Sequence, residues 1–279
     1  MGNAKVSDIA IPLKMVIVAM DTNMGGSASR AFQTLRRDYP GLSLILHGAS
    51  EWSERPEKLE RCRADILSAD IVVATMLFME DHFKPVINEL KARRDSADAL
   101  VGLMSAGEVM KMTRMGSFKM DGEPGGIAGL LKRLRGGSKE KATTAGAQQM
   151  KMLKRLPQIL RFIPGTAQDV RAYFLALQYW LSGSDDNIVN LVRMIIDRYA
   201  SGPRRVLRGR VKVIPPVDYP EVGVYHPRLA GRISTDPSKL PRLGRRGTIG
   251  LLGLRSYMLA GNSKHYDGVI EALEARGLD

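Results

Sequence analysis

Four continuous apolar runs alternate with helix-like segments through residues 15–105. Apolar runs without polar alternation are typical of strands covered on both faces, as in a parallel sheet. The predicted strands are Met15–Met20, Leu42–Leu46, Ile71–Leu77 and Ala99–Met104, and the predicted helices are Ser27–Asp38, Pro56–Leu67 and His82–Arg94. Strands joined by such helices indicate right-handed crossovers, so the pattern predicts an α/β domain with a doubly wound parallel sheet of the flavodoxin-like or Rossmann-like class.

The pattern changes after this domain. Residues 115–149 are rich in Gly, Lys and Arg, which predicts a connector or flap. Two helices are predicted next: Ala167–Leu181, and a second that Ser184 and Asp185 cap and that Gly202 and Pro203 end. A proline-rich stretch with a short strand at Val222–Tyr225 follows, and it is expected to route the chain between domains.

The last predicted elements are a strand at Thr248–Ser256 and a helix at Ser263–Arg276. A strand followed by a helix usually leads to a neighbouring parallel strand, because both elements need a covering layer. We therefore expect the start of a second α/β domain that is cut off at Asp279. A helix that folds back onto an existing sheet is the alternative.

These patterns divide the chain into six parts. They are a tail (1–14), the amino-terminal α/β domain (15–115), a Gly-rich basic linker or flap (116–149), a helical segment (150–202), a proline-rich connector (203–247) and the start of the second domain (248–279).

Composition adds a strong positive charge. Lys and Arg outnumber Asp and Glu by 42 to 29, and the formal net charge is +13. Such a charge suggests nucleic acid, phosphate or anionic lipid as a partner, but aromatic residues, on which bases stack, make up only 6%. A solvated basic surface is the favoured interpretation. A single cysteine, Cys62, and the lack of a signal-peptide pattern or of an apolar run of membrane-spanning length predict a cytoplasmic protein.

Few residues suggest chemistry by themselves. Gly25 and Gly26 follow the first predicted strand, where such sheets bind phosphates, but their spacing fits neither the dinucleotide fingerprint nor the nucleotide loop that carries a lysine. A tight turn with Ser27 as the helix N-cap is favoured, and ATP binding is not supported. Cys62 is expected to be an ordinary half-buried thiol.

The four histidines are not spaced for zinc, and no catalytic or metal-ligating residue is predicted. His47 follows a strand and is expected to be structural. His226 ends the strand Val222–Tyr225 and is better placed to face a cleft. The remaining two are His82 and His265.

The segment Thr248–Gly277, which contains Arg255-Ser256, His265-Tyr266 and Leu-Glu-Ala-Arg-Gly, resembles the start of the domain shared by the large subunits of magnesium chelatase and aerobic cobaltochelatase. The stretch Val224–Pro227 fits the same pattern. Three further stretches, Met15–Asp21, Ile71–Met79 and Ser105–Met120, resemble the amino-terminal domain of the porphyrin-binding, H-type subunit of magnesium chelatase, in the version found in photosynthetic bacteria.

The resemblance implies the amino-terminal part of a much longer subunit. That subunit binds protoporphyrin IX and is the place where Mg²⁺ is inserted in (bacterio)chlorophyll biosynthesis, and two smaller partner subunits hydrolyse ATP. The residues that hold porphyrin and metal are expected mostly outside these 279 residues, so no porphyrin-binding residue is assigned and the chain by itself is expected to be inactive. Tyr225, His226 and Arg255 are the places to look if porphyrin contacts exist, because Arg pairs with propionates and Tyr packs on rings.

Two other functions stay open. One is a cobaltochelatase-like subunit acting on a corrin ring, against which the amino-terminal domain argues. The other is an independent basic α/β module that binds nucleic acid or phosphate ligands.

Overall fold

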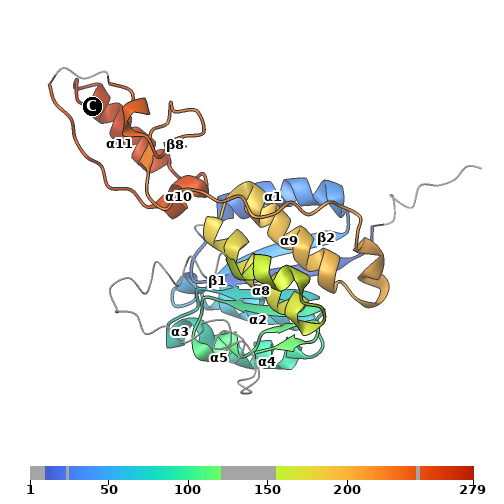
Figure 1. Cartoon of the computed structure of the whole chain (residues 1–279). Helices are drawn as coiled ribbons and strands as arrows, with labels where there is room; N and C mark the ends of the chain where they lie inside the picture. The colour runs from blue at the N-terminus through green and yellow to red at the C-terminus, as the bar shows by residue number, and fades with distance from the viewer. Residues whose placement is uncertain (1–9, 23–24, 121–154, 243–245) are drawn as a thin grey trace, which may run out of the picture.

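The computed structural model describes residues 10–22, 25–120, 155–242 and 246–279 (Figure 1). Its main sheet has the strand order β2-β1-β3-β4-β5-β6. The parallel strands are β1 (Leu13–Ala19), β2 (Leu42–Gly48), β3 (Ile71–Thr75) and β4 (Ala99–Leu103). This order and the crossover helices confirm the predicted doubly wound α/β class.

The sheet continues past Met115, where the sequence predicts a connector. The strands β5 (Arg114–Met115) and β6 (Phe118–Lys119) form a hairpin that pairs antiparallel with β4. Its turn requires Gly116, which has φ +58° and whose Cβ would lie 2.6 Å from Asp169 Oδ2. Residues 121–149 of the predicted linker lie outside the described residues.

One face of the sheet is covered by helices from within the α/β unit. These are α2 (Pro56–Ser68), the short α3 (Glu80–Phe83), α4 (Ile87–Arg94) and α5 (Gly107–Met110). The prediction of one helix over His82–Arg94 is wrong, because a 3₁₀ turn (η3, Lys84–Val86) separates α3 from α4. Pro85 lies in that turn, and proline removes a helical N–H donor and crowds the preceding turn.

The opposite face is covered by α1 (Gly25–Asp38) together with two helices from much later in the chain, α8 (Thr166–Ser182) and α9 (Asp185–Tyr199). Two ion pairs, Arg30–Asp185 and Asp38–Arg193, have the same sequence offset of 155 residues, so α1 and α9 run parallel. Figure 1 shows these three helices together over the sheet. The helical segment is therefore one layer of the α/β/α sandwich.

Both later helices match their predicted positions. Ser184 caps α9, since its Oγ accepts a hydrogen bond from the Asn187 amide. A 3₁₀ helix (η5, Gly202–Leu207) follows the end of α9. A second short 3₁₀ helix (η4, Leu160–Phe162) precedes α8, and another (η2, Ala49–Glu51) follows β2.

The carboxyl-terminal unit, residues 219–279, projects from this body (Figure 1). It contains the hairpin of β7 (Val224–Tyr225) and β8 (Ile233–Ser234), the 3₁₀ helix η6 (Pro237–Lys239), α10 (Arg255–Leu259) and α11 (Lys264–Glu274). Of the predicted strand Val222–Tyr225, only Val224–Tyr225 pairs as a strand, and the last predicted helix is confirmed.

The predicted strand at Thr248–Ser256 is wrong: residues 248–254 have no regular structure, and α10 begins at Arg255. A strand requires a hydrogen-bonded neighbour along its length. Within the described part of the chain, such pairing extends only over Arg246–Ile249, which bond to Gly277–Asp279. The apolar side chains that suggested a buried strand are exposed, with Leu252 97% accessible.

If α8 and α9 are one layer of the sandwich, both faces of the sheet should unfold together. The two tryptophans report on the two faces separately, because Trp52 lies in the α2 and α4 cluster and Trp180 in the α8 and α9 cluster. We expect coincident urea transitions by fluorescence for Trp52→Phe and Trp180→Phe. Ile195 is a fully buried residue of α9. Ile195→Ala should lower the free energy of unfolding by about 3 kcal/mol, whether the transition is followed by the fluorescence of Trp52 or of Trp180. Val206→Ala, at an exposed site, is the control. Two separate transitions would contradict this architecture.

Candidate functional site

Sheets of this class bind ligands after the first strand, beside the amino end of the following helix. In this protein, the carboxyl-terminal unit of the same chain contacts that position. The helix α1 begins at Gly25, so Ser27 lies inside its first turn and the prediction of Ser27 as N-cap is wrong. Ser27 is fully buried, and its Oγ donates to the Ala260 carbonyl of the carboxyl-terminal unit at 3.1 Å. The acceptor lies 233 residues away, so no local pattern could reveal it.

Arg30 joins three parts of the molecule at this point. Its Nη2 donates to the Ala260 carbonyl at 2.9 Å and to Asp185 Oδ1 at 2.9 Å, at the start of α9. Gly261, with φ +64°, permits the approach, because a Cβ there would lie 2.7 Å from Arg30 Nη2. These contacts dock the carboxyl-terminal unit on the amino end of α1.

The other single candidates have structural surroundings. His47 Nε2 lies 2.8 Å from Asp65 Oδ2, and the pKa of His47 is lowered, chiefly by burial, although Asp65 acts in the opposite direction. Cys62 is fully buried, and burial raises the pKa of its thiol to about 12, so the thiolate is not available near neutral pH.

The three residues suggested for porphyrin contact, Tyr225, His226 and Arg255, bond within their own unit. The Tyr225 hydroxyl donates to Ser263 Oγ at 2.7 Å, and His226 Nε2 lies 3.2 Å from Glu274 Oε1. Arg255 donates to the carbonyls of residues 219 and 220. These contacts hold β7 and α10 in the unit and leave porphyrin contact by these residues a hypothesis.

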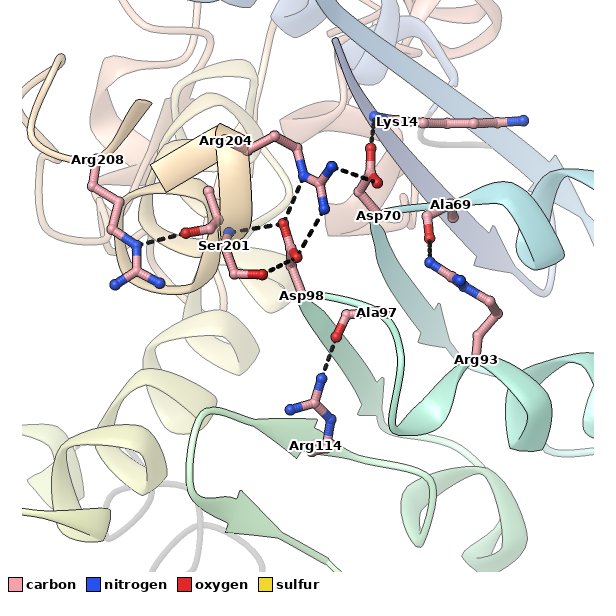
Figure 2. Close-up of polar contacts among 11 residues, drawn as sticks. Lys14, Ala69, Asp70, Arg93, Ala97, Asp98, Arg114, Ser201, Arg204 and Arg208 are labelled. Carbon is pink, nitrogen blue, oxygen red and sulfur yellow. Dashed lines mark hydrogen bonds and ion pairs between the residues drawn. The ribbon is translucent and has the colours of Figure 1, made fainter. Parts of the chain in front are cut away.

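A cluster that the sequence analysis did not identify lies at the opposite edge of the sheet, where the parallel strands begin (Figure 2). The triplet Ser-Ala-Asp directly precedes both β3 and β4, ending in Asp70 and Asp98. Amino ends of adjacent parallel strands meet at one edge, so the two carboxylates come together. Both preceding alanine carbonyls, of Ala69 and Ala97, accept a hydrogen bond from an arginine, Arg93 and Arg114 respectively.

Arg204 of η5 binds both carboxylates. Its Nε and Nη2 donate to the two oxygens of Asp98 at 2.9 and 3.0 Å, and its Nη1 lies 3.1 Å from Asp70 Oδ1. Ser201 also donates its amide to Asp98, at 3.0 Å. A bidentate arginine on a buried carboxylate is among the stronger polar contacts in proteins. This contact ties the segment after α9 to the sheet.

Electrostatics favours the charged form of Asp98. Burial opposes its ionisation, but the hydrogen bonds from Arg204 and Ser201 outweigh that effect, so the pKa of Asp98 lies below its usual value. A carboxylate saturated by donors is a poor general base. The cluster is therefore suited to structure and to charge recognition, and not to proton transfer. The repeated Ser-Ala-Asp triplet is the signal that could have revealed it.

The described part of the chain offers no ready metal centre. It contains no group of three or more His, Cys, Asp or Glu side chains arranged to hold a metal ion. Among the helices of those same residues, none combines the length and the apolar character needed to cross a bilayer.

The fold and this edge define a flavodoxin-like α/β protein in which a later helical hairpin joins α1 to complete one helical layer. The chain belongs to the family described as Domain of unknown function (DUF3479), whose model matches residues 14–174. A second model, CobN/Magnesium Chelatase, matches residues 177–279.

Relatives carry the magnesium-chelatase name. The chain is 47% identical over 265 residues to the magnesium-chelatase H subunit of Cereibacter sphaeroides and 46% identical to that of Rhodobacter capsulatus, in both cases over 95% of this chain. Identity to the chloroplastic magnesium-chelatase ChlH subunit of Oryza sativa subsp. indica is 29%, also over 95%. The resemblance to magnesium-chelatase H subunits inferred from the sequence is confirmed. The chain spans 22% of the length of either bacterial relative and 20% of the rice one.

The Asp98 contacts predict a pH-dependent loss of stability in Asp98→Asn. The pKa of Asp98 is lower in the folded state than in the unfolded state. The ionised Asp98 therefore adds its full share to the free energy of unfolding above the unfolded pKa of about 4, and this share is lost as the pH falls through the folded pKa. We expect the variant to be about 3 kcal/mol less stable at pH 7, with the difference shrinking below about pH 4. Urea denaturation across pH measures it.

The matched control is Asp95→Asn, whose carboxylate is exposed and 3.3 Å from Lys119. That substitution should cost less than about 0.5 kcal/mol. A difference between wild type and Asp98→Asn that stays constant from pH 7 to pH 3 would refute the assigned role of the charge.

Proposed function

We propose that this chain acts as the amino-terminal part of the porphyrin-binding subunit of magnesium chelatase. With two ATPase partner subunits, the complete subunit would insert Mg²⁺ into protoporphyrin IX in (bacterio)chlorophyll biosynthesis, in the cytoplasm. The supporting observation is the 47% identity to a magnesium-chelatase H subunit over 95% of the chain. The two family models support the same assignment, because together they match nearly all of residues 14–279.

The chemistry of the reaction suggests a division of labour. Mg²⁺ gives up its water reluctantly and prefers oxygen ligands, whereas a porphyrin offers four nitrogens, two of which must first lose protons. Insertion therefore requires a dry cavity with a base, whereas the carboxylates of the Asp98 cluster are committed to internal contacts. We propose that this part positions other parts of the subunit and that the insertion site is built by polypeptide outside residues 1–279.

ATP hydrolysis belongs to the partner subunits in this proposal. The amino end of α1, where a sheet of this class would hold a phosphate, bonds the Ala260 carbonyl through Ser27 and Arg30. Its glycines also lack the spacing of a nucleotide loop.

The other two candidates receive less support. A cobaltochelatase-like role is disfavoured because the relatives described above are named for magnesium. A nucleic-acid module is disfavoured because several arginines, among them Arg30, Arg193 and Arg204, form ion pairs with acids of the same chain. Affinity for nucleic acid that falls steeply with ionic strength would favour that module instead.

A chimera tests the proposal. Residues 15–279 would replace the matching segment of the H subunit from Cereibacter sphaeroides, and the chimera would be combined with its ATPase partners, ATP, Mg²⁺ and protoporphyrin IX. We expect metalloporphyrin fluorescence to appear, and we expect none when the segment is deleted. A folded chimera that produces no metalloporphyrin, beside an active parent subunit, would reject the proposal.

The chain without the rest of such a subunit should be inactive. Under the same conditions we expect no metalloporphyrin fluorescence above the rate without protein, because the described residues contain no candidate metal site. The full-length relative serves as the positive control. A clear signal from residues 1–279 would show that insertion chemistry resides here.

A further inference from the structure

A cavity of about 320 Å³ lies beside the Asp98 cluster. It is open to solvent on one side and is lined by the starts of β4 and β5, the β5–β6 turn, the first turn of α8 and the end of α9. Three arginines line it: Arg114, Arg198 and Arg208. They come from sequence positions as far apart as 94 residues, so only the tertiary structure brings them together.

The two acids that line the cavity do not use these arginines. Asp98 is bonded by Arg204 and Ser201. Asp169 accepts the amide and hydroxyl of Ser117 on Oδ2, both at 2.9 Å, and the hydroxyl of Tyr199 on Oδ1 at 3.0 Å. Both carboxylates have their partners elsewhere, so neither neutralises the lining arginines through an ion pair.

The arginines keep N–H groups for another acceptor. Arg114 donates Nη2 to the carbonyl of Ala97, and Arg208 donates Nε to the carbonyl of residue 200 (Figure 2). Arg114 also donates Nε to the carbonyl of residue 94. The remaining donors of these two groups have no acceptor among the described residues. Arg198 is half-buried and forms no hydrogen bond or ion pair with any described residue.

Positive charge is concentrated where α8 begins and α9 ends. The pKa of Arg171 is lowered, first by burial and then by the charges of Arg198 and Arg161. Like charges held together raise the free energy of the folded state, and a bound anion relieves that repulsion. Guanidinium groups match the paired oxygens of phosphate and carboxylate, which makes such an oxyanion the fitting ligand.

We propose that the cavity lined by Arg114, Arg198 and Arg208 is a binding site for a multivalent oxyanion, such as a phosphate group or a small polycarboxylate. The site lies at the amino edge of the sheet, opposite the edge where proteins of this class bind ligands. Oxyanion binding here is independent of the proposed function.

Calorimetric titration with inorganic phosphate and, separately, with citrate tests the site, at constant ionic strength balanced with sodium chloride. Saturable 1:1 binding by at least one of the two is expected for wild type. The double variant Arg198→Ala/Arg208→Ala should weaken it by about tenfold or more, since a hydrogen bond to a charged group contributes about 1.5–3 kcal/mol. The tighter of the two probes identifies the ligand group as phosphate or carboxylate.

The matched control is Arg205→Ala/Lys212→Ala, which removes the same charge from exposed positions outside the cavity. Its affinity should equal that of wild type. Equal weakening in the two double variants would mean diffuse charge attraction and would overturn the proposal, as would the absence of saturable binding to wild type. Far-UV circular dichroism checks folding. Arg198→Ala alone, which removes no hydrogen bond or ion pair among the described residues, keeps the test valid if the double variant unfolds.

Discussion

The structure depends on covering one apolar face of a parallel sheet. Strands β1, β3 and β4 present buried side chains to both sides, and a face left in water would forgo the hydrophobic free energy that makes the sheet stable. The first helix contributes only Ala31 and Leu35 to the buried cluster on that face, whereas α8 and α9 contribute most of its helical residues. The helical hairpin is thus required by the sheet, although more than 40 residues separate it from β6.

Ion pairs mark where that hairpin meets the sheet. Arg30 and Asp185 join the amino-terminal halves of α1 and α9, and Asp38 and Arg193 join their later turns. Arg204 binds the two acids that directly precede β3 and β4. Hydrophobic burial is non-directional, so directional contacts of this kind select one register of packing among several. Arginines that composition alone would assign to a solvated surface are used here to position helices.

The same arrangement separates the two edges of the sheet. At the carboxyl edge, Ser27 and Arg30 bind the backbone of the carboxyl-terminal unit, so the usual ligand position becomes a contact between the regions matched by the two family models. At the amino edge, the acids are saturated by Arg204 and its neighbours, and three further arginines surround a cavity. A simple nucleotide-binding sheet holds its ligand at the carboxyl edge. In this protein the carboxyl edge docks another part of the chain, and the proposed oxyanion site lies at the amino edge.

The sequence by itself determined the four parallel strands, the helices α1 and α2 and the pair α8 and α9, because the period of apolar residues reports burial directly. Its motifs also determined the resemblance to chelatase subunits. The tertiary structure alone decided that α8 and α9 cover the sheet, that Ser27 bonds Ala260, and that Asp70 and Asp98 share Arg204. It also decided that residues 248–254 do not form a strand, since an apolar run specifies burial but a strand exists only where another backbone pairs with it. Each of these features joins residues distant in the chain, and periodicity carries no information about such partners.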